Sequence, residues 1–109
     1  MARVLLSALA RQDVRDILTD LSEHAGLAVA GRYGADFKRI YRSLAQFPYG
    51  GSQRRSLGPD VRIKIAFPYV VFDEHIADTV TILRILHGRR EITADLLARS
   101  RGVAPPRRG

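Results

Sequence analysis

The sequence has no cysteine and no long hydrophobic run. Without cysteine there is no disulfide, no thiolate metal ligand and no cysteine nucleophile. The apolar run near the N-terminus, in MARVLLSALARQDVRD, meets Arg11 and Asp13 well before it reaches the length of a signal peptide or a membrane-spanning helix. We therefore expect a cytoplasmic protein that does not associate with a membrane.

Common catalytic and metal-binding patterns are also missing. The three histidines, His24, His75 and His87, do not have zinc-ligand spacing, and no paired-carboxylate arrangement stands out. The segment GGSQRR lacks the lysine and the following helix of a phosphate-binding loop. We therefore expect no metal site and no cofactor.

Acidic residues are scarce relative to basic ones. The chain has 18 basic and 11 acidic side chains, a net charge of +7, and 16 of the basic residues are arginine. Residues 1–53 carry seven basic and five acidic side chains, whereas residues 54–109 carry eleven and six. Arginine suits planar contact with phosphate or carboxylate groups. The charge predicts an acidic partner, which RNA, DNA or an acidic protein segment would satisfy equally.

The length of 109 residues is that of one domain, and we assign residues 1–100 to it. The composition of residues 101–109 predicts a basic, disordered tail. In the first half, the apolar run at residues 3–8 predicts a strand. Apolar residues at helical spacing then predict a helix that stops at Gly26, and a second helix from Leu27 to residue 44. Gly31 and Gly34 in the second helix suggest close packing against the first.

The second half reads as a loop at residues 47–60 followed by three strands and a weak helix. The strands are expected at residues 61–68, 69–74 and 79–86, where apolar residues alternate or run together. The helix is expected at residues 92–101, with Thr93 as N-cap. The order β-α-α-β-β-β predicts an α+β fold with a helical hairpin packed on a small, mostly antiparallel sheet.

The stretch TVTILRILHGRREI, residues 79–92, runs from a strand into a cluster of charge. Alternation places Val80, Ile82, Arg84 and Leu86 on one face, so Arg84 interrupts an apolar surface. Its stem could cover that surface while its head reaches solvent or a carboxylate such as Asp73 or Glu74. The alternative is a phosphate or carboxylate clamp formed with Arg62.

His87 lies beside this basic cluster. It could act as a general acid or base, or it could be a histidine hydrogen-bonded at a strand end. Arg89 and Arg90 could be a solvated charge pair or a site for an acidic partner. A metal-free ribonuclease would need such groups around a phosphate, and the candidates are His87, Arg62, Arg84 and Lys64.

The last phenylalanine or tyrosine in the chain is Phe72. Stacking of a single-stranded base would therefore depend on Tyr69, Tyr49 or the plane of an arginine.

Three features of the sequence belong together: the order of elements, the helix entry LLSALARQDVRDIL and the block LGPDVRIKIAFPYVVFDEHIADTVTILRILHGRREI. With these features the chain resembles the ParE/RelE family of bacterial toxins from type II toxin–antitoxin modules. The resemblance covers residues 3–93, and it implies the RelE/ParE-like fold. Its most specific features are Arg62, Tyr69, Arg84 and the run His87 to Arg90.

The resemblance implies two activities on one fold. RelE-like members cut mRNA on the ribosome, typically with a tyrosine or a His-Tyr pair near the C-terminus, whereas ParE-like members poison DNA gyrase. Here no tyrosine follows Tyr69, and Lys64 is the one lysine on the predicted strands, which favours the ParE-like branch with no catalytic residues.

The resemblance also implies a cognate antitoxin as partner. Gyrase is then the expected target, with the ribosome and its mRNA as the alternative. A degenerate toxin that merely pairs with an antitoxin is a third hypothesis. The residues expected to bind partners are Arg62, Tyr69, Arg84, His87, Arg89 and Arg90.

Overall fold

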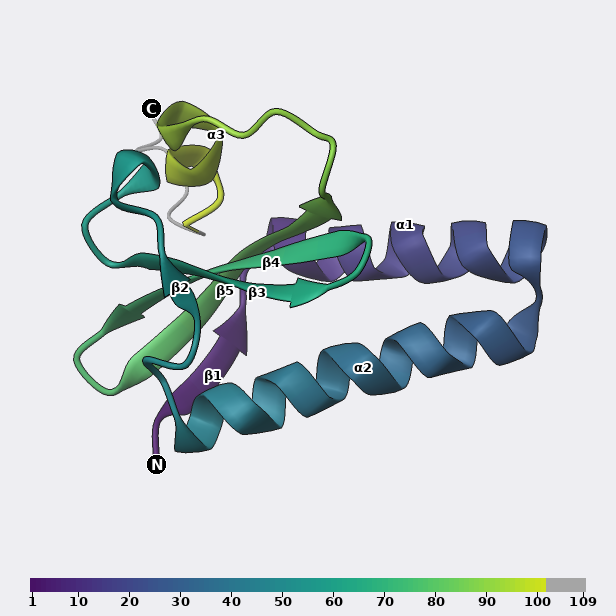
Figure 1. Cartoon of the computed structure of the whole chain (residues 1–109), viewed down its shortest axis with the longest axis horizontal. Helices are drawn as coiled ribbons and strands as arrows, with labels where there is room; N and C mark the ends of the chain where they lie inside the picture. The colour runs from purple at the N-terminus through teal and green to yellow at the C-terminus, as the bar shows by residue number, and fades with distance from the viewer. Residues whose placement is uncertain (102–109) are drawn as a thin grey trace, which may run out of the picture.

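The computed structural model describes residues 1–101, and in it two long helices pack on a five-stranded sheet (Figure 1). This arrangement confirms the predicted α+β fold with a helical hairpin. The elements in chain order are β1 (Arg3–Leu6), α1 (Ala8–Ala25), α2 (Leu27–Gln46), β2 (Ser52–Gln53), the 3-10 turn η1 (Arg55–Leu57), β3 (Val61–Ala66), β4 (Tyr69–Ile76), β5 (Thr79–His87) and α3 (Ala94–Arg99).

The helical hairpin begins at Ser7 and turns at Gly26. The Ser7 hydroxyl accepts a hydrogen bond from the Ala10 N–H at 3.0 Å and donates one to the Leu83 carbonyl at 2.8 Å. This cap explains why β1 ends at Leu6, earlier than the predicted strand. Gly26 has φ +98, a conformation that favours glycine, so α1 ends there as predicted and α2 starts at the next residue.

The strands are ordered β1-β5-β4-β3-β2, with β1 parallel to β5 and the other pairs antiparallel, which confirms the mostly antiparallel sheet. β2 was not predicted, because residues 47–60 were expected to form a loop. A Cβ at Gly51 would lie 2.5 Å from the Ile63 carbonyl oxygen. Glycine at this position therefore lets the loop approach β3 closely enough to add a short edge strand.

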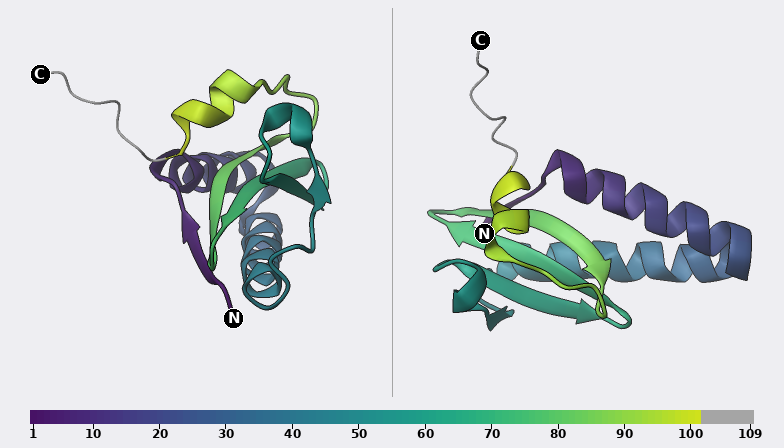
Figure 2. Two further views of the ribbon diagram at one scale, coloured as in Figure 1. Left: turned by 90° about the vertical axis from the view of Figure 1, so that its left-hand side faces the viewer. Right: turned by 90° about the horizontal axis from the view of Figure 1, so that it is seen from above.

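Both faces of the sheet are covered, but unequally. The helical hairpin packs on one face around Phe37, Leu44 and Ile82, and it extends past the end of the sheet (Figure 2). On the other face α3 contributes the fully buried Leu97, which contacts a smaller cluster containing Phe72. Thr93 caps α3 as predicted, because its hydroxyl accepts from the Leu96 N–H at 3.1 Å.

A β-bulge in β5 changes which residues share a face. Phe72 of β4 pairs with Arg84 and Asp73 pairs with Ile82, so Leu83 has no partner across the strand pair. The extra residue shifts the alternation by one position. The predicted common face of Val80, Ile82 and Leu86 is therefore wrong: Val80 and Ile82 pack with the helical hairpin, whereas Leu86 packs with α3.

The glycines of α2 do not mark close packing against α1, contrary to expectation. A Cβ added at Gly31 would meet no atom within 4 Å, and one at Gly34 would make an ordinary contact of 3.7 Å with Leu18. The predicted tail lies outside the described residues from position 102 onward. Within residues 1–101, no helix is long and apolar enough to cross a membrane.

Candidate functional site

Tyr69 and His87 face each other across β4 and β5, with their ring centroids 5.8 Å apart. Together they form the wall between two clefts. The first cleft, of about 340 Å³, lies beside α1 and is lined by Asp16, Asp20, Tyr69, His87 and Arg90 among others. The second, of about 350 Å³, is lined by Ile65, Phe67, Pro68, Tyr69, Val70, His87, Gly88 and Arg89. We call Ile65, Phe67, Tyr69, His87, Arg89 and Arg90 the His87 end.

Hydrogen bonds within the turn after β5 restrict the chemistry of His87. The Arg89 N–H donates to His87 Nδ1 at 3.1 Å, and the Arg90 N–H donates to the His87 carbonyl at 2.9 Å. Because Nδ1 accepts a hydrogen bond, the neutral imidazole carries its proton on Nε2. The ring can then donate a hydrogen bond through Nε2, while its lone pair at Nδ1 faces the Arg89 N–H within the turn.

Tyr69 is held by aromatic rings and stays protonated at neutral pH. Its ring makes edge contacts with Tyr33 and Phe37, at centroid distances of 5.5 and 6.1 Å. Burial raises the pKa of the Tyr69 hydroxyl, and the neighbouring Tyr33 and Asp20 raise it further. The phenol can therefore donate a hydrogen bond, and it is a poor base at neutral pH.

The two clefts differ in electrostatic character. In the first, Asp16 and Asp20 on the exposed side of α1 line the same space as Arg90, so charges of both signs meet there. In the second, Arg89 lies beside a mostly apolar lining that includes Phe67 and Ile65, whose exposed fractions are 84% and 57%. The second cleft therefore offers an apolar surface next to a cation, which is the pattern of a protein-binding site.

Arg84 is not part of the His87 end. Its Nε and Nη2 donate to the Asp13 carboxylate at 2.7 and 2.8 Å, and both side chains are only 11% exposed. This hydrogen bond raises the pKa of Arg84, which burial alone would lower. The Arg84 guanidinium does reach a carboxylate, as one of the two interpretations of Arg84 predicted. The suggested partners, Asp73 and Glu74, were wrong. Glu74 instead binds Arg101 with contacts of 2.8–3.0 Å.

Asp73, the other suggested partner, is fully buried. Among the described residues neither of its carboxylate oxygens has a hydrogen-bond partner. Burial raises the pKa of Asp73 to about 7, although Arg62 and Lys64 oppose the shift.

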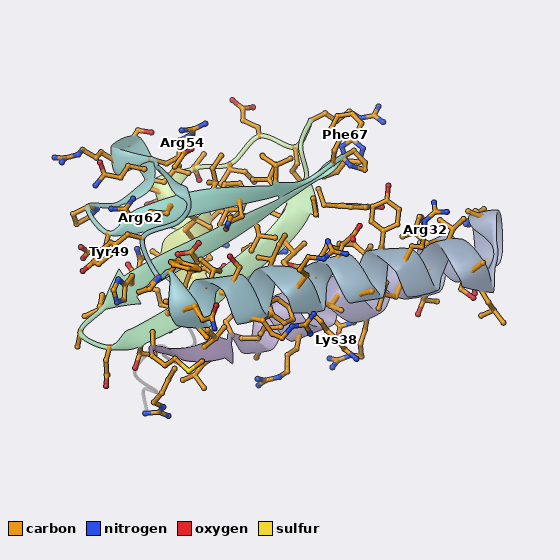
Figure 3. The ribbon with its side chains drawn as sticks, turned by 60° about the horizontal axis from the view of Figure 1, so that its bottom comes forward. Arg32, Lys38, Tyr49, Arg54, Arg62 and Phe67 are labelled. Carbon is orange, nitrogen blue, oxygen red and sulfur yellow. The ribbon has the colours of Figure 1, made fainter. Side chains whose placement is uncertain are left out.

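Arg62 lies at the opposite end of β3 from the His87 end, as Figure 3 shows by the labelled positions of Arg62 and Phe67. It is four residues from Ala66, the residue paired with Tyr69, which is roughly 13 Å along a strand. Its guanidinium donates to the carbonyls of Tyr49 and Gly51, at 3.4 and 3.1 Å. The predicted clamp between Arg62 and Arg84 is therefore not assembled in this structure.

The predicted site residues thus fall into three places. Tyr69, His87, Arg89 and Arg90 come together, Arg84 is paired with Asp13, and Arg62 lies with Tyr49. Sequence reasoning missed Asp13, although an acid between the apolar Ala10 and Val14 of one helix face was a usable signal. It also missed the exposed ring of Phe67, because alternation places that residue in a strand but does not show what covers it.

Comparisons with known proteins assign this chain to a class. Residues 4–92 match the model of the ParE toxin of the type II toxin–antitoxin system parDE. The chain is 30% identical over 96 residues to Toxin ParE3 of Caulobacter vibrioides, covering 88% of this chain and 96% of the relative. The chain therefore belongs to the ParE family of type II toxin–antitoxin toxins, which confirms the resemblance.

A solved structure, described as the chromosomal ParDE TA system from P. aeruginosa, has the same fold. Its TM-score is 0.67 at 22% sequence identity, and the match covers 80% of this chain and 96% of that chain. At this identity the likeness supports the fold alone.

Proposed function

We propose that this protein is a growth-inhibiting toxin that poisons DNA gyrase and is neutralised by a cognate antitoxin. Membership of the ParE family supports the toxin class. The choice of gyrase over ribosomal mRNA depends on the arrangement of the four residues a metal-free ribonuclease would need, His87, Arg62, Arg84 and Lys64.

The separation of His87, Arg62 and Arg84, three of these four residues, is the observation that carries the proposal. A ribonuclease must gather a base and cations around one phosphate. Here the Asp13 carboxylate holds Arg84, the Tyr49 and Gly51 carbonyls hold Arg62, and the Arg89 N–H occupies His87 Nδ1. This arrangement supports an inhibitor that acts by binding rather than by cutting RNA.

The His87 end is the surface that we assign to the antitoxin. Antitoxin segments that fold on binding gain affinity by burying apolar groups and by matching charge. Phe67 and Ile65 supply exposed apolar surface, and Arg89 and Arg90 supply cations beside it. The partner chemistry that fits is an acidic segment with apolar side chains at intervals.

A DNA supercoiling assay with purified gyrase tests the proposed target. We expect the toxin to reduce supercoiling and to cause cleaved DNA to accumulate, and we expect added antitoxin to relieve both effects. If protein that stops growth in cells has no effect on gyrase at large molar excess, the proposal fails. Cleavage of mRNA in a translation extract would then be measured.

A binding assay tests the surface assigned to the antitoxin. Arg89→Glu combined with Arg90→Glu should weaken antitoxin affinity at least tenfold at low salt, since two cations become anions beside an acidic partner. The matched control is Arg11→Glu combined with Arg15→Glu, which makes the same charge change on exposed positions of α1. Equal losses in both variants would show that net charge, and not the His87 end, determines the affinity.

A further inference from the structure

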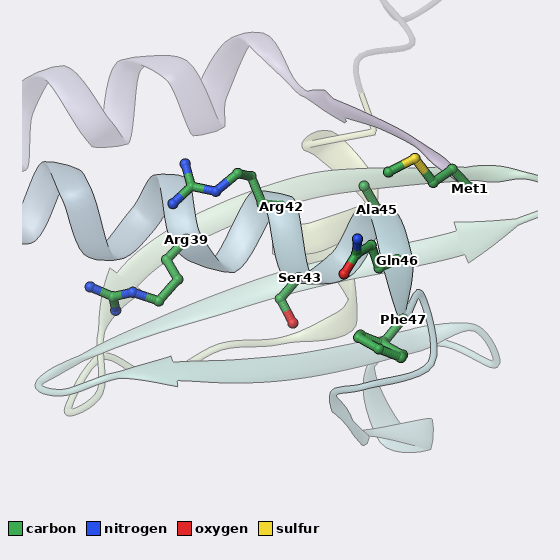
Figure 4. Close-up of a pocket in the computed structure, with 7 residues that line it drawn as sticks. All are labelled: Met1, Arg39, Arg42, Ser43, Ala45, Gln46 and Phe47. Carbon is green, nitrogen blue, oxygen red and sulfur yellow. The ribbon is translucent and has the colours of Figure 1, made fainter.

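A second surface, separate from the His87 end, joins the C-terminal end of α2 to the outer edge of the sheet. Arg42 and Phe47 line a cleft of about 410 Å³ with Arg39, Ser43 and Gln46 (Figure 4). Phe47 is followed by the loop that contains Tyr49, and the Tyr49 carbonyl accepts a hydrogen bond from the Arg62 guanidinium. Arg54 follows β2, and its N–H donates to the Val61 carbonyl at 2.9 Å. We call Arg42, Phe47, Tyr49, Arg54, Arg55 and Arg62 the arginine edge; Figure 3 shows part of it.

The charge of this surface is positive and weakly neutralised. Among residues 1–101, no ion pair engages Arg42, Arg54, Arg55 or Arg62. The nearby Asp36 binds Arg39 at 2.8 Å, and Asp73 is buried beneath the surface. Asp60, two residues before Arg62, adds one exposed carboxylate. Guanidinium groups still outnumber carboxylates on this surface, and such an excess is an electrostatic footprint for a polyanion.

Two exposed aromatic rings, Phe47 and Tyr49, also belong to the arginine edge. Phe47 and Tyr49 are 64% and 67% exposed, and the Tyr49 ring makes an edge contact with His75 at a centroid distance of 4.5 Å. The Arg62 guanidinium lies 5.0 Å from the centre of the Tyr49 ring, and hydrogen bonds to two carbonyls hold it there. Exposed rings and a fixed guanidinium plane beside cations are the elements that stack unpaired bases and contact their phosphates.

We propose that the arginine edge binds single-stranded DNA without cleaving it. Bases stack on Phe47 and on the paired Tyr49 and Arg62, while Arg42, Arg54 and Arg55 contact phosphates. An acidic peptide fits less well, because the apolar groups here are rings flanked by cations. The exposed aliphatic surface suited to a peptide, at Ile65, lies at the His87 end instead.

This inference rests on the proposed function in one respect: if gyrase is the target, the toxin comes close to DNA. The binding itself needs no gyrase. Fluorescence anisotropy with the full chain and a labelled single-stranded oligonucleotide, at several salt concentrations, therefore tests it independently. We expect binding at low salt, weaker binding to a duplex of the same sequence and length, and a linear fall of log affinity with log salt.

Matched variants locate the binding surface. Arg42→Ala with Arg54→Ala should weaken binding about tenfold or more and should lower the salt slope by about 1.4, since each contact to a single strand contributes about 0.7. Arg15→Ala with Arg99→Ala removes the same charge from exposed positions elsewhere and should have a much smaller effect. Thermal unfolding of each variant checks that it remains folded.

Two phenylalanine variants separate the contribution of base stacking from that of charge. Phe47→Ala should weaken single-strand binding about fivefold or more while leaving the salt slope unchanged, because stacking contributes at least about 1 kcal/mol per base. Phe67→Ala removes a more exposed ring, 84% against 64%, from the His87 end and should leave DNA affinity unchanged.

Several outcomes would overturn the inference. They are no binding at low salt, equal losses in both arginine variants, a preference for the duplex, or tighter binding of an RNA of the same sequence. A loss of antitoxin affinity in the Arg42 and Arg54 variant, with DNA affinity unchanged, would make this surface a protein site. If DNA binds as expected but gyrase is unaffected, gyrase is not the target, and the assignment of DNA binding to the arginine edge is retained.

Discussion

The Asp13 carboxylate of α1 binds both the Arg84 side chain and the backbone of β5. It accepts from Arg84 Nε and Nη2 at 2.7 and 2.8 Å, and from the Ile85 N–H at 3.0 Å. These bonds join residues 71 and 72 positions apart, directly after the bulge at Leu83. One carboxylate therefore fixes the helical hairpin against the sheet and satisfies a backbone group that the irregular strand exposes.

Breaking this pair should be costly. Asp13→Asn leaves the Arg84 charge buried without a counter-ion, and we expect the free energy of unfolding in urea to fall by about 3 kcal/mol. Asp36→Asn breaks the exposed pair with Arg39 and should cost less than about 1 kcal/mol. Similar small losses in both variants would show that the buried pair does not stabilise the fold in this way.

Asp73 should make stability depend on pH. Its pKa is about 7 in the folded protein, against 3.8 for an unperturbed aspartate, so between these values the folded state binds more protons than the unfolded chain. The contribution of Asp73 to the free energy of unfolding therefore falls as pH rises from about 4 to about 7. Asp73→Asn should be more stable than the natural protein above pH 7, by at most about 4 kcal/mol, and the difference should shrink below pH 5.

Urea unfolding across this pH range measures the difference. Asp60→Asn, an exposed position, is the control and should shift stability little at any pH. A difference between the natural protein and Asp73→Asn that stays constant with pH would contradict the assignment to Asp73.

Gly31 should tolerate a side chain, whereas Gly51 should not. Gly31→Ala adds a Cβ in open space within a helix, so we expect a gain of about 1 kcal/mol in the free energy of unfolding. Gly51→Ala places a Cβ 2.5 Å from the Ile63 carbonyl oxygen and should destabilise the pairing of β2 with β3. Thermal unfolding tests both, and opposite signs are expected.

Leu97 should account for most of the attachment of α3. It is fully buried, so Leu97→Ala should lower stability by about 3 kcal/mol and should speed hydrogen exchange in α3. Leu27→Ala changes a leucine that is 80% exposed and should cost less than about 1 kcal/mol. Unchanged exchange in α3 after Leu97→Ala would mean that other contacts, such as Arg101 with Glu74, hold the helix.

His87→Ala distinguishes the two branches of the family in cells. Since His87 Nδ1 accepts from the Arg89 N–H, we expect growth arrest within about twofold of the natural toxin and no mRNA cleavage by either protein. Loss of growth arrest by orders of magnitude, with an unchanged melting temperature, would instead indicate a ribonuclease.

Part of the candidate site could be predicted from sequence. Residues 87–90 are consecutive, so the grouping of His87, Arg89 and Arg90 needed no tertiary information. Tyr69 joins them because β4 and β5 form a hairpin, which the two adjacent strand patterns also predicted. Arg62 is separated from this group by its position on β3, four residues before Ala66, the partner of Tyr69. Its bonds to the Tyr49 and Gly51 carbonyls, in a loop 11 to 13 residues away, could not be predicted from the sequence.

The sequence by itself determined the order of the main elements, the stop at Gly26, the cap at Thr93 and the excess of arginine. These features depend on periodicity, on local hydrogen bonds and on composition, all of which act within a few residues. Only the tertiary structure decided that Asp13 binds Arg84, that Leu83 bulges, that β2 pairs with β3 and that Phe47 and Phe67 stay exposed. Those outcomes depend on how distant segments pack, and a one-residue shift in register changes which face a side chain occupies.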